Sequence, residues 1–256
     1  MGIKYNVAAL SRTGIVRERN EDKIFINSKI RLFGVCDGMG GLKYGKETAE
    51  MVSEYFRQHS LIDDSVISYS KISKEQVIQE IILDIDQRIA FRNYSWYVRY
   101  GCTLCGVWII NNHEAMIFNL GDSRCYIFKS NAQEGKLLTR DHNQASELCN
   151  ENETVSISNS QNALGKNILT KYIGNPGSNE PDIIKVNYQN GDRFLICTDG
   201  LYNELQEKEI DNIMYNYGHK DITETSKNLV EESIVAGGRD NISVVLIEFK
   251  DESGGL

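Results

Sequence analysis

The chain has 256 residues, with 28 Lys and Arg against 36 Asp and Glu, and a formal net charge of −8. This acidic balance, without a long basic cluster, argues against nucleic acid as a partner. No stretch approaches the roughly 20 apolar residues that cross a bilayer, and no signal-peptide core is visible, so we expect a cytoplasmic monomer without a membrane partner. Because no Pro-rich or Gly/Ser-rich linker interrupts the sequence, we expect one domain over residues 1–256.

The first half of the chain predicts strands followed by two helices. Alternating apolar and polar residues favour strands over 5–10 and 23–30, on either side of a charged loop. Apolar residues at helical spacing predict helices over 46–59 and 73–91, and these should pack together on a sheet. Ser73 and Gln76 form a capping-box pattern at the start of the second helix.

The second half is richer in strands. Strand-like runs cover 104–110, 115–120 and 125–128, and a further pair covers 183–188 and 193–197 across a turn; consecutive strands of this kind predict antiparallel pairing. Residues 147–165 are polar and predict a mobile surface insertion. Helices over 206–217 and 223–236 and a last strand over 241–249 complete a plan that indicates helices covering layered sheets.

The six cysteines lie in or beside apolar runs, at positions 36, 102, 105, 125, 149 and 197, and are expected to be reduced and buried. Cys102 and Cys105 have the spacing of a redox or zinc pair. However, residues three apart in an extended strand point to opposite faces, so we expect the two sulfurs to diverge.

Four apolar runs lie next to an aspartate: Asp37, Asp122, Asp199 and Asp240. Glu21 and Asp22 add two further acids. Two carboxylates about 4 Å apart repel by about 4 kcal/mol at an effective dielectric near 20, so a convergent set requires cations or protons between its members. Oxygen ligands favour magnesium or manganese over zinc. An Asp-Gly pair alone would indicate a hairpin turn, but four acid-tipped runs together favour a metal site.

Residues 40–46 satisfy most of the phosphate-loop pattern G-x-x-x-x-G-K and make a nucleotide hydrolase an alternative. Three features oppose it. Glu47 stands where a Ser or Thr should hold magnesium, and Asp37 lies just upstream, where its charge would oppose nucleotide phosphates. The consecutive strands also differ from the alternating parallel sheet of such enzymes.

Seven motifs in order resemble the motif series of the metal-dependent type 2C (PPM) protein serine/threonine phosphatases, and the Asp-Gly-Met-Gly-Gly form is similar to the bacterial branch. The motifs are Arg17-Glu18-Arg19-Asn20-Glu21-Asp22, Asp37-Gly38-Met39-Gly40-Gly41, Gly101-Cys102-Thr103, Gly121-Asp122-Ser123-Arg124, Leu138-Thr139-Arg140-Asp141-His142, Cys197-Thr198-Asp199-Gly200-Leu201 and Gly238-Arg239-Asp240-Asn241-Ile242-Ser243.

This resemblance implies an α+β fold, a four-layer α-β-β-α sandwich in which two central antiparallel sheets are flanked by helix pairs, with a mobile flap-like insertion at about 143–180. It also implies two Mn2+ or Mg2+ ions in a cleft between the sheets. By position, the implied ligands are Asp37, bridging both ions, the Gly38 carbonyl, Asp199 and Asp240. Glu21, Asp22 and Asn241 would hold metal-bound water or support the ligands, and Arg17 would grip the substrate phosphate.

The implied activity is hydrolysis of phosphoserine and phosphothreonine in proteins by a metal-activated water that attacks phosphorus directly, in opposition to a serine/threonine kinase. The expected partners are phosphorylated proteins, including such a kinase or its targets. A catalytically silent relative that serves as a binding module is the alternative from another class.

Several residues depart from the family or have plainer explanations. Met39 stands where many eukaryotic relatives have a histidine, and because a thioether has no proton to donate, a metal-bound water is the expected donor. Asn203 stands where relatives with a third ion have an acid, so a third ion should bind weakly, with Asp122 its best ligand. Arg17 has the alternative of a solvated loop charge. His142 is expected to support a loop, and Trp96 and Trp108 to pack.

Overall fold

The computed structural model describes residues 4–39, 44–58, 72–93, 101–148, 165–175, 180–216 and 221–250. Its strands form two five-stranded antiparallel sheets. One contains β1 (Tyr5–Arg12), β10 (Ile242–Phe249), β9 (Arg193–Cys197), β6 (Arg124–Phe128) and β7 (Lys136–Leu137), in that order. The other contains β2 (Lys23–Asn27), β3 (Leu32–Cys36), β4 (Leu104–Ile109), β5 (Glu114–Leu120) and β8 (Asp182–Asn187).

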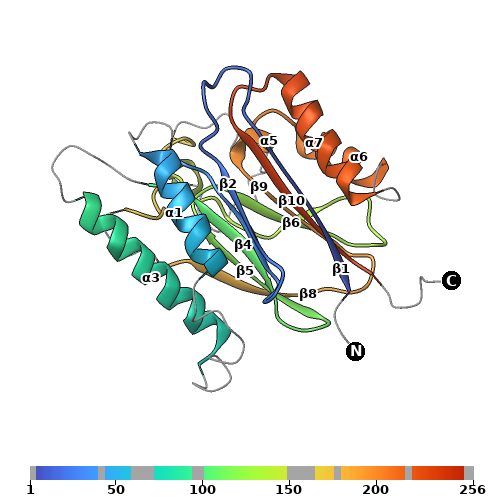
Figure 1. Cartoon of the computed structure of the whole chain (residues 1–256). Coiled ribbons are helices and arrows are strands. Elements are labelled where there is room, and N and C mark those ends of the chain that lie inside the picture. The colour runs from blue at the N-terminus through green and yellow to red at the C-terminus, as the bar shows by residue number, and fades with distance from the viewer. Residues whose placement is uncertain are drawn as a thin grey trace.

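The helices cover the outer faces of the two sheets, which confirms the predicted four-layer sandwich (Figure 1). Helices α1 (Gly45–Gln58) and α3 (Lys74–Asn93) cover the β2-β3-β4-β5-β8 sheet, whereas α6 (Glu207–Asn216) and α7 (Ile222–Ala236) cover the other. Two short helices, α4 (Gln144–Leu148) and α5 (Asp199–Tyr202), and the two-residue β7 were not predicted.

Three apolar layers hold the sandwich together. Below α1 and α3, Phe56 stacks on Phe25 and Phe118 with ring centroids 5.1 and 5.6 Å apart. The space between the sheets is filled by buried apolar side chains, both aliphatic, such as Val35 and Val245, and aromatic, such as Phe33 and Phe194. β4 presents alternate residues to these two layers because side chains alternate along a strand.

The cysteine prediction is confirmed for the residues that the structure describes. Cys102 lies in the core below α1 and α3, whereas Cys105 lies between the sheets, so the two thiols face opposite sides of the sheet. The described cysteines, at positions 36, 102, 105, 125 and 197, are all free and buried. Cys149 lies outside the described residues.

The predicted helix start at Ser73 is also confirmed. The Ser73 hydroxyl accepts a hydrogen bond from the Gln76 backbone N–H (3.2 Å), and the Gln76 side-chain oxygen accepts one from the Ser73 N–H (3.0 Å). This reciprocal pair satisfies two donors that the first turn of a helix leaves without intrahelical partners.

The antiparallel pairing predicted for consecutive strands is confirmed for β4 with β5, but it was wrong for β5 with β6 and for β8 with β9. β5 pairs with β8 and β6 pairs with β9, so the chain crosses from one sheet to the other at Gly121, which has φ +111°, and again over residues 188–192. At the second crossing the buried carboxylate of Asp192 accepts N–H bonds from Ser130 and Gln189, which stabilises a sheet-to-sheet connection in place of a hairpin.

Several predictions concern residues outside the ranges that the structure describes. Most of the polar segment 147–165, residues 176–179 of the flap-like insertion, and Trp96 lie outside the described residues. The flap and the single-domain boundaries therefore stay predictions. Among the described helices, none is long and apolar enough to cross a membrane.

Candidate active site

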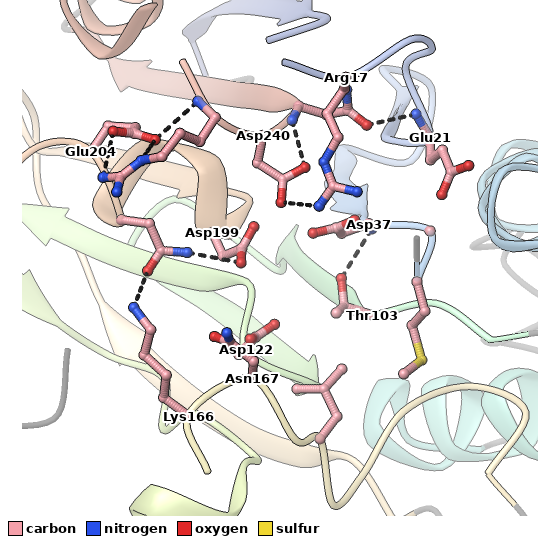
Figure 2. Close-up of a pocket in the computed structure, with 16 residues that line it drawn as sticks. Arg17, Glu21, Asp37, Thr103, Asp122, Lys166, Asn167, Asp199, Glu204 and Asp240 are labelled. Carbon is pink, nitrogen blue, oxygen red and sulfur yellow. Dashed lines mark hydrogen bonds and ion pairs between the residues drawn. The ribbon is translucent and has the colours of Figure 1, made fainter. Parts of the chain in front are cut away.

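A cleft opens where strands from both sheets end, and acids from four different strand ends line it. Asp37 directly follows β3, Asp122 follows β5, Asp199 follows β9 by two positions, and Asp240 precedes β10. Figure 2 shows the side chains of Asp37, Asp199 and Asp240 pointing toward a common space. The structure thus brings together the predicted acids, although they are up to 203 positions apart in the sequence.

Burial and neighbouring acids raise the pKa of three cleft carboxylates, Asp37, Asp122 and Asp199. Burial raises the pKa of Asp37 well above its usual range, and the neighbouring Asp22, Asp199, Asp122 and Asp240 raise it further. Burial, followed by the charge of Asp199, likewise raises the pKa of Asp122. Burial and Asp240 raise the pKa of Asp199 to about 6. Such a set favours bound cations because removing water penalises each negative charge.

The donor chemistry of the cleft fits hard divalent ions. Among the described residues, Glu21 Oε2, Asp22 Oδ1 and Asp199 Oδ1 are buried oxygens without a hydrogen-bond partner. Carboxylate and carbonyl oxygens are the ligands that Mg2+ and Mn2+ prefer. Among the residues that the structure describes, no group of three or more His, Cys, Asp or Glu side chains is already arranged to hold a metal ion. The fit therefore rests on donor type and burial.

Arg17 spans the cleft and is not a free loop charge. Its Nη2 donates to Asp240 Oδ2 at 2.7 Å, while 44% of its side chain stays exposed. This hydrogen bond raises the pKa of Arg17, so the guanidinium is charged. This pairing favours a role in the cleft over that of a solvated loop charge.

Below the cleft floor, Asp22 connects strands of both sheets. Its Oδ2 accepts hydrogen bonds from the hydroxyls of Thr198 (2.8 Å) and Ser243 (2.7 Å), and burial raises its pKa to about 7. Asn241 fixes the neighbouring loop, because its side-chain oxygen accepts from the Glu21 N–H at 2.9 Å and its Nδ2 donates to the Arg19 carbonyl. The Glu21 side chain itself lines the cleft.

Hydroxyl groups pin the backbone of Asp37. The Asp37 N–H donates to Thr103 Oγ1 at 3.0 Å, and Thr103 Oγ1 lies 2.7 Å from Ser123 Oγ. These contacts join three of the seven motifs, and the sequence had given Thr103 and Ser123 no role of their own. The sequence signal that could have identified Thr103 and Ser123 is that each is a hydroxyl residue within one of the seven motifs.

Gly38 and Gly45 lie in close contact next to the cleft. A Cβ at Gly38 would lie 2.5 Å from the Gly45 carbonyl carbon, so a side chain there would displace the start of α1. The close contact with Gly38 therefore explains why position 45 is a glycine, without a phosphate loop that binds a nucleotide. The consistently antiparallel sheets likewise differ from the parallel sheet behind a phosphate loop.

Other residues behave as predicted or were missed. His142 supports a loop, since its Nδ1 accepts from the Gly121 N–H (3.1 Å) and its Nε2 lies 3.0 Å from Asp182. Trp108 is fully buried and packs. Met39 lines the cleft. The sequence had not singled out the remaining lining residues Lys166, Asn167, Leu169, Glu204 and Arg239.

A β-sandwich with helix pairs on its outer faces and an acid-lined cleft at its strand ends defines a class of phosphate-ester hydrolases. The family model described as protein phosphatase 2C matches residues 15–237. The chain therefore belongs to the protein phosphatase 2C family of serine/threonine phosphatases, and it is an enzyme.

Individual relatives agree. The serine/threonine phosphatase stp of Listeria innocua is 30% identical over 244 residues, covering 92% of each chain. The serine/threonine phosphatase of S. agalactiae superposes with a TM-score of 0.79 at 26% identity, covering 96% of this chain and 99% of that one. A PstP catalytic domain in complex with two manganese ions shares the fold, with a TM-score of 0.78, 23% identity and coverages of 96% and 99%.

Proposed function

We propose that the enzyme hydrolyses phosphoserine and phosphothreonine in proteins, using two Mn2+ or Mg2+ ions held by Asp37, the Gly38 carbonyl, Asp199 and Asp240. The observation that supports this most is the convergence of buried carboxylates, some with unpartnered oxygens, in one cleft. The two manganese ions in the PstP complex support the same ion count. Its substrates would be phosphorylated by a serine/threonine kinase, and would include that kinase or its targets.

The roles of the residues around the cleft follow from their contacts. When bound, the divalent ions lower the pKa of water and offset the negative charge that repels an anionic nucleophile from a phosphate ester. The exposed, forked guanidinium of Arg17 can exchange Asp240 for a phosphate, to which it would bind through two N–H groups. Asn241 and Asp22 hold the Glu21 loop and the ends of β9 and β10 in register around the ions.

Burial makes four of the described cysteines poor nucleophiles. Burial raises the pKa of Cys36, Cys105 and Cys125 well above the usual value, and that of Cys197 to about 12. Because the thiolate is the reactive form, these side chains are inert near neutral pH. This supports direct hydrolysis by water without a phosphoenzyme.

One assay tests the proposal: phosphate release from a phosphothreonine peptide and from ATP, with and without Mn2+. We expect manganese-dependent release from the peptide, and its loss in Asp37→Ala with the fold intact by circular dichroism. Asp84→Ala is the matched control, since this aspartate lies on α3 and pairs with Arg88. Unchanged turnover in Asp37→Ala would refute the assignment. Release from ATP that depends on Lys46 would favour the nucleotide hydrolase, and inactivity with every substrate would favour a binding module.

Arg17→Ala separates binding from chemistry. If Arg17 holds the substrate phosphate in the ground state, the substitution should chiefly raise KM. A defect confined to kcat, with KM unchanged, would contradict this role. The cytoplasmic, monomeric state expected from the composition stays a prediction.

A further inference from the structure

One corner of the cleft contains a cation supplied by the chain itself. Lys166 Nζ donates to Asn203 Oδ1 at 3.2 Å, and Asn203 Nδ2 donates to Asp199 Oδ2 at 2.9 Å (Figure 2). An ammonium, an amide and a carboxylate therefore form one continuous hydrogen-bonded series, from the segment 165–175 to α5. Asp122 lines the same corner.

The amide is required by both of its partners. An ammonium can only donate and an ionised carboxylate can only accept, so the residue between them must accept on one side and donate on the other. Asn203 does both. An aspartate at this position could accept from Lys166 but could not donate to Asp199, and its charge would repel that carboxylate.

Lys166 differs from the other two cations of the cleft. Arg17 pairs with Asp240 at 2.7 Å and Arg239 pairs with Glu204 at 2.9 Å, whereas Lys166 has no carboxylate within 4.0 Å among the described residues. Its charge is instead directed at the buried Asp199 through the amide. Burial dominates the pKa of Asp199, and Lys166 is among the groups that lower it.

We infer that the Lys166 ammonium, held by Asn203, neutralises the Asp122–Asp199 corner of the cleft and takes the place of a third divalent ion there. This inference rests on the proposed two-ion function. An ion bound in that corner would need the Asn203 oxygen, which already accepts from Lys166. It would also lie near the Lys166 ammonium, whose positive charge would repel it. On this inference the cleft binds two divalent ions, and the Lys166 ammonium takes the place of the third.

Manganese stoichiometry tests this independently of activity. Native mass spectrometry at saturating Mn2+ should show two ions on the wild type. The double variant Lys166→Met/Asn203→Asp removes the ammonium and adds a carboxylate, so it should bind three. Lys171→Met is the matched control, because Lys171 lies in the same segment but pairs with Asp182 at 3.2 Å and does not line the cleft. It should keep two ions.

Single variants keep the test decisive if the double variant does not fold. Asn203→Asp alone should still bind two ions, since Lys166 would pair with the new carboxylate. Lys166→Met alone should also bind two, because the neutral Asn203 remains. Three ions on the wild type with activity intact would overturn this inference but not the proposed function. Two ions on a folded double variant would also overturn it. A wild type that binds no manganese would overturn both.

Discussion

The molecule contains two kinds of buried or half-buried carboxylate. Asp141 and Asp192 have cations from their own chain: Arg124 binds Asp141 through Nε at 2.9 Å and Nη2 at 2.7 Å, and Lys129 binds Asp192 at 2.8 Å. The cleft acids Asp37 and Asp122 have no such partner among the described residues, and their pKa values are raised by burial and by neighbouring acids.

This difference separates structural charges from functional ones. A buried carboxylate that only supports the fold is neutralised where it stands, as Asp141 is by a guanidinium that also stacks 3.7 Å from the Tyr202 ring centre. A carboxylate kept without compensation lowers the stability of the empty protein and is retained for what it can bind. Raised pKa values in a cleft therefore identify the site independently of the motifs.

Arg124→Met gives the largest expected effect on the structural side. It leaves Asp141 buried and uncompensated, so the free energy of unfolding should fall by about 3–5 kcal/mol, measured by urea denaturation. The double variant Arg124→Met/Asp141→Leu should recover most of this loss. If the single variant were as stable as the wild type, Asp141 would not depend on its internal partner.

Manganese should produce the next largest effect, and only on the functional side. At 100 times the dissociation constant, Mn2+ should stabilise the fold by about 2.7 kcal/mol, seen as a higher melting temperature. Asp37→Asn should abolish this gain, whereas Lys129→Met should keep it. An equal gain in Asp37→Asn would show that the ions bind elsewhere.

A pH series on the metal-free protein sharpens the comparison further. The pKa of Asp199 in the folded protein, about 6, lies above its usual value of 3.8 because burial and Asp240 raise it, so folding favours the protonated form. Its unfavourable contribution is therefore absent below about pH 4, grows as the pH rises, and is complete above about pH 6. The melting temperature of Asp199→Asn minus that of the wild type should increase over this range. A difference independent of pH would contradict the raised pKa.

Lys129→Met should have the smallest effect, about 1 kcal/mol or less of unfolding free energy by urea denaturation. Asp192 retains N–H donors from Ser130 and Gln189, and the Lys129 side chain is 39% exposed, so solvent screens the pair. A loss as large as that of Arg124→Met would remove the distinction between a partly screened and a fully buried pair.

Local patterns predicted most elements of the fold, and the order of the acid-tipped runs predicted the cleft. The Ser73 capping box and the opposed Cys102 and Cys105 were correct because both depend on residues within a few positions. The partners of β6 and β8 were wrong because pairing across sheets depends on contacts far apart in sequence. The Lys166–Asn203 contact was missed for the same reason: 37 positions separate its members, and neither lay in a pattern that predicts the other.

The last strand, β10, lies inside its sheet, between β1 and β9, and Arg17 meets Asp240 across 223 positions. A ribosome must therefore release residues 240–249 before this sheet can close, and until then no strand joins β1 to β9. The enzyme cannot acquire its cleft gradually during synthesis, so a nascent chain that lacks these residues has no means to act on phosphoproteins. Assembly of the catalytic centre is in this way tied to the synthesis of β10.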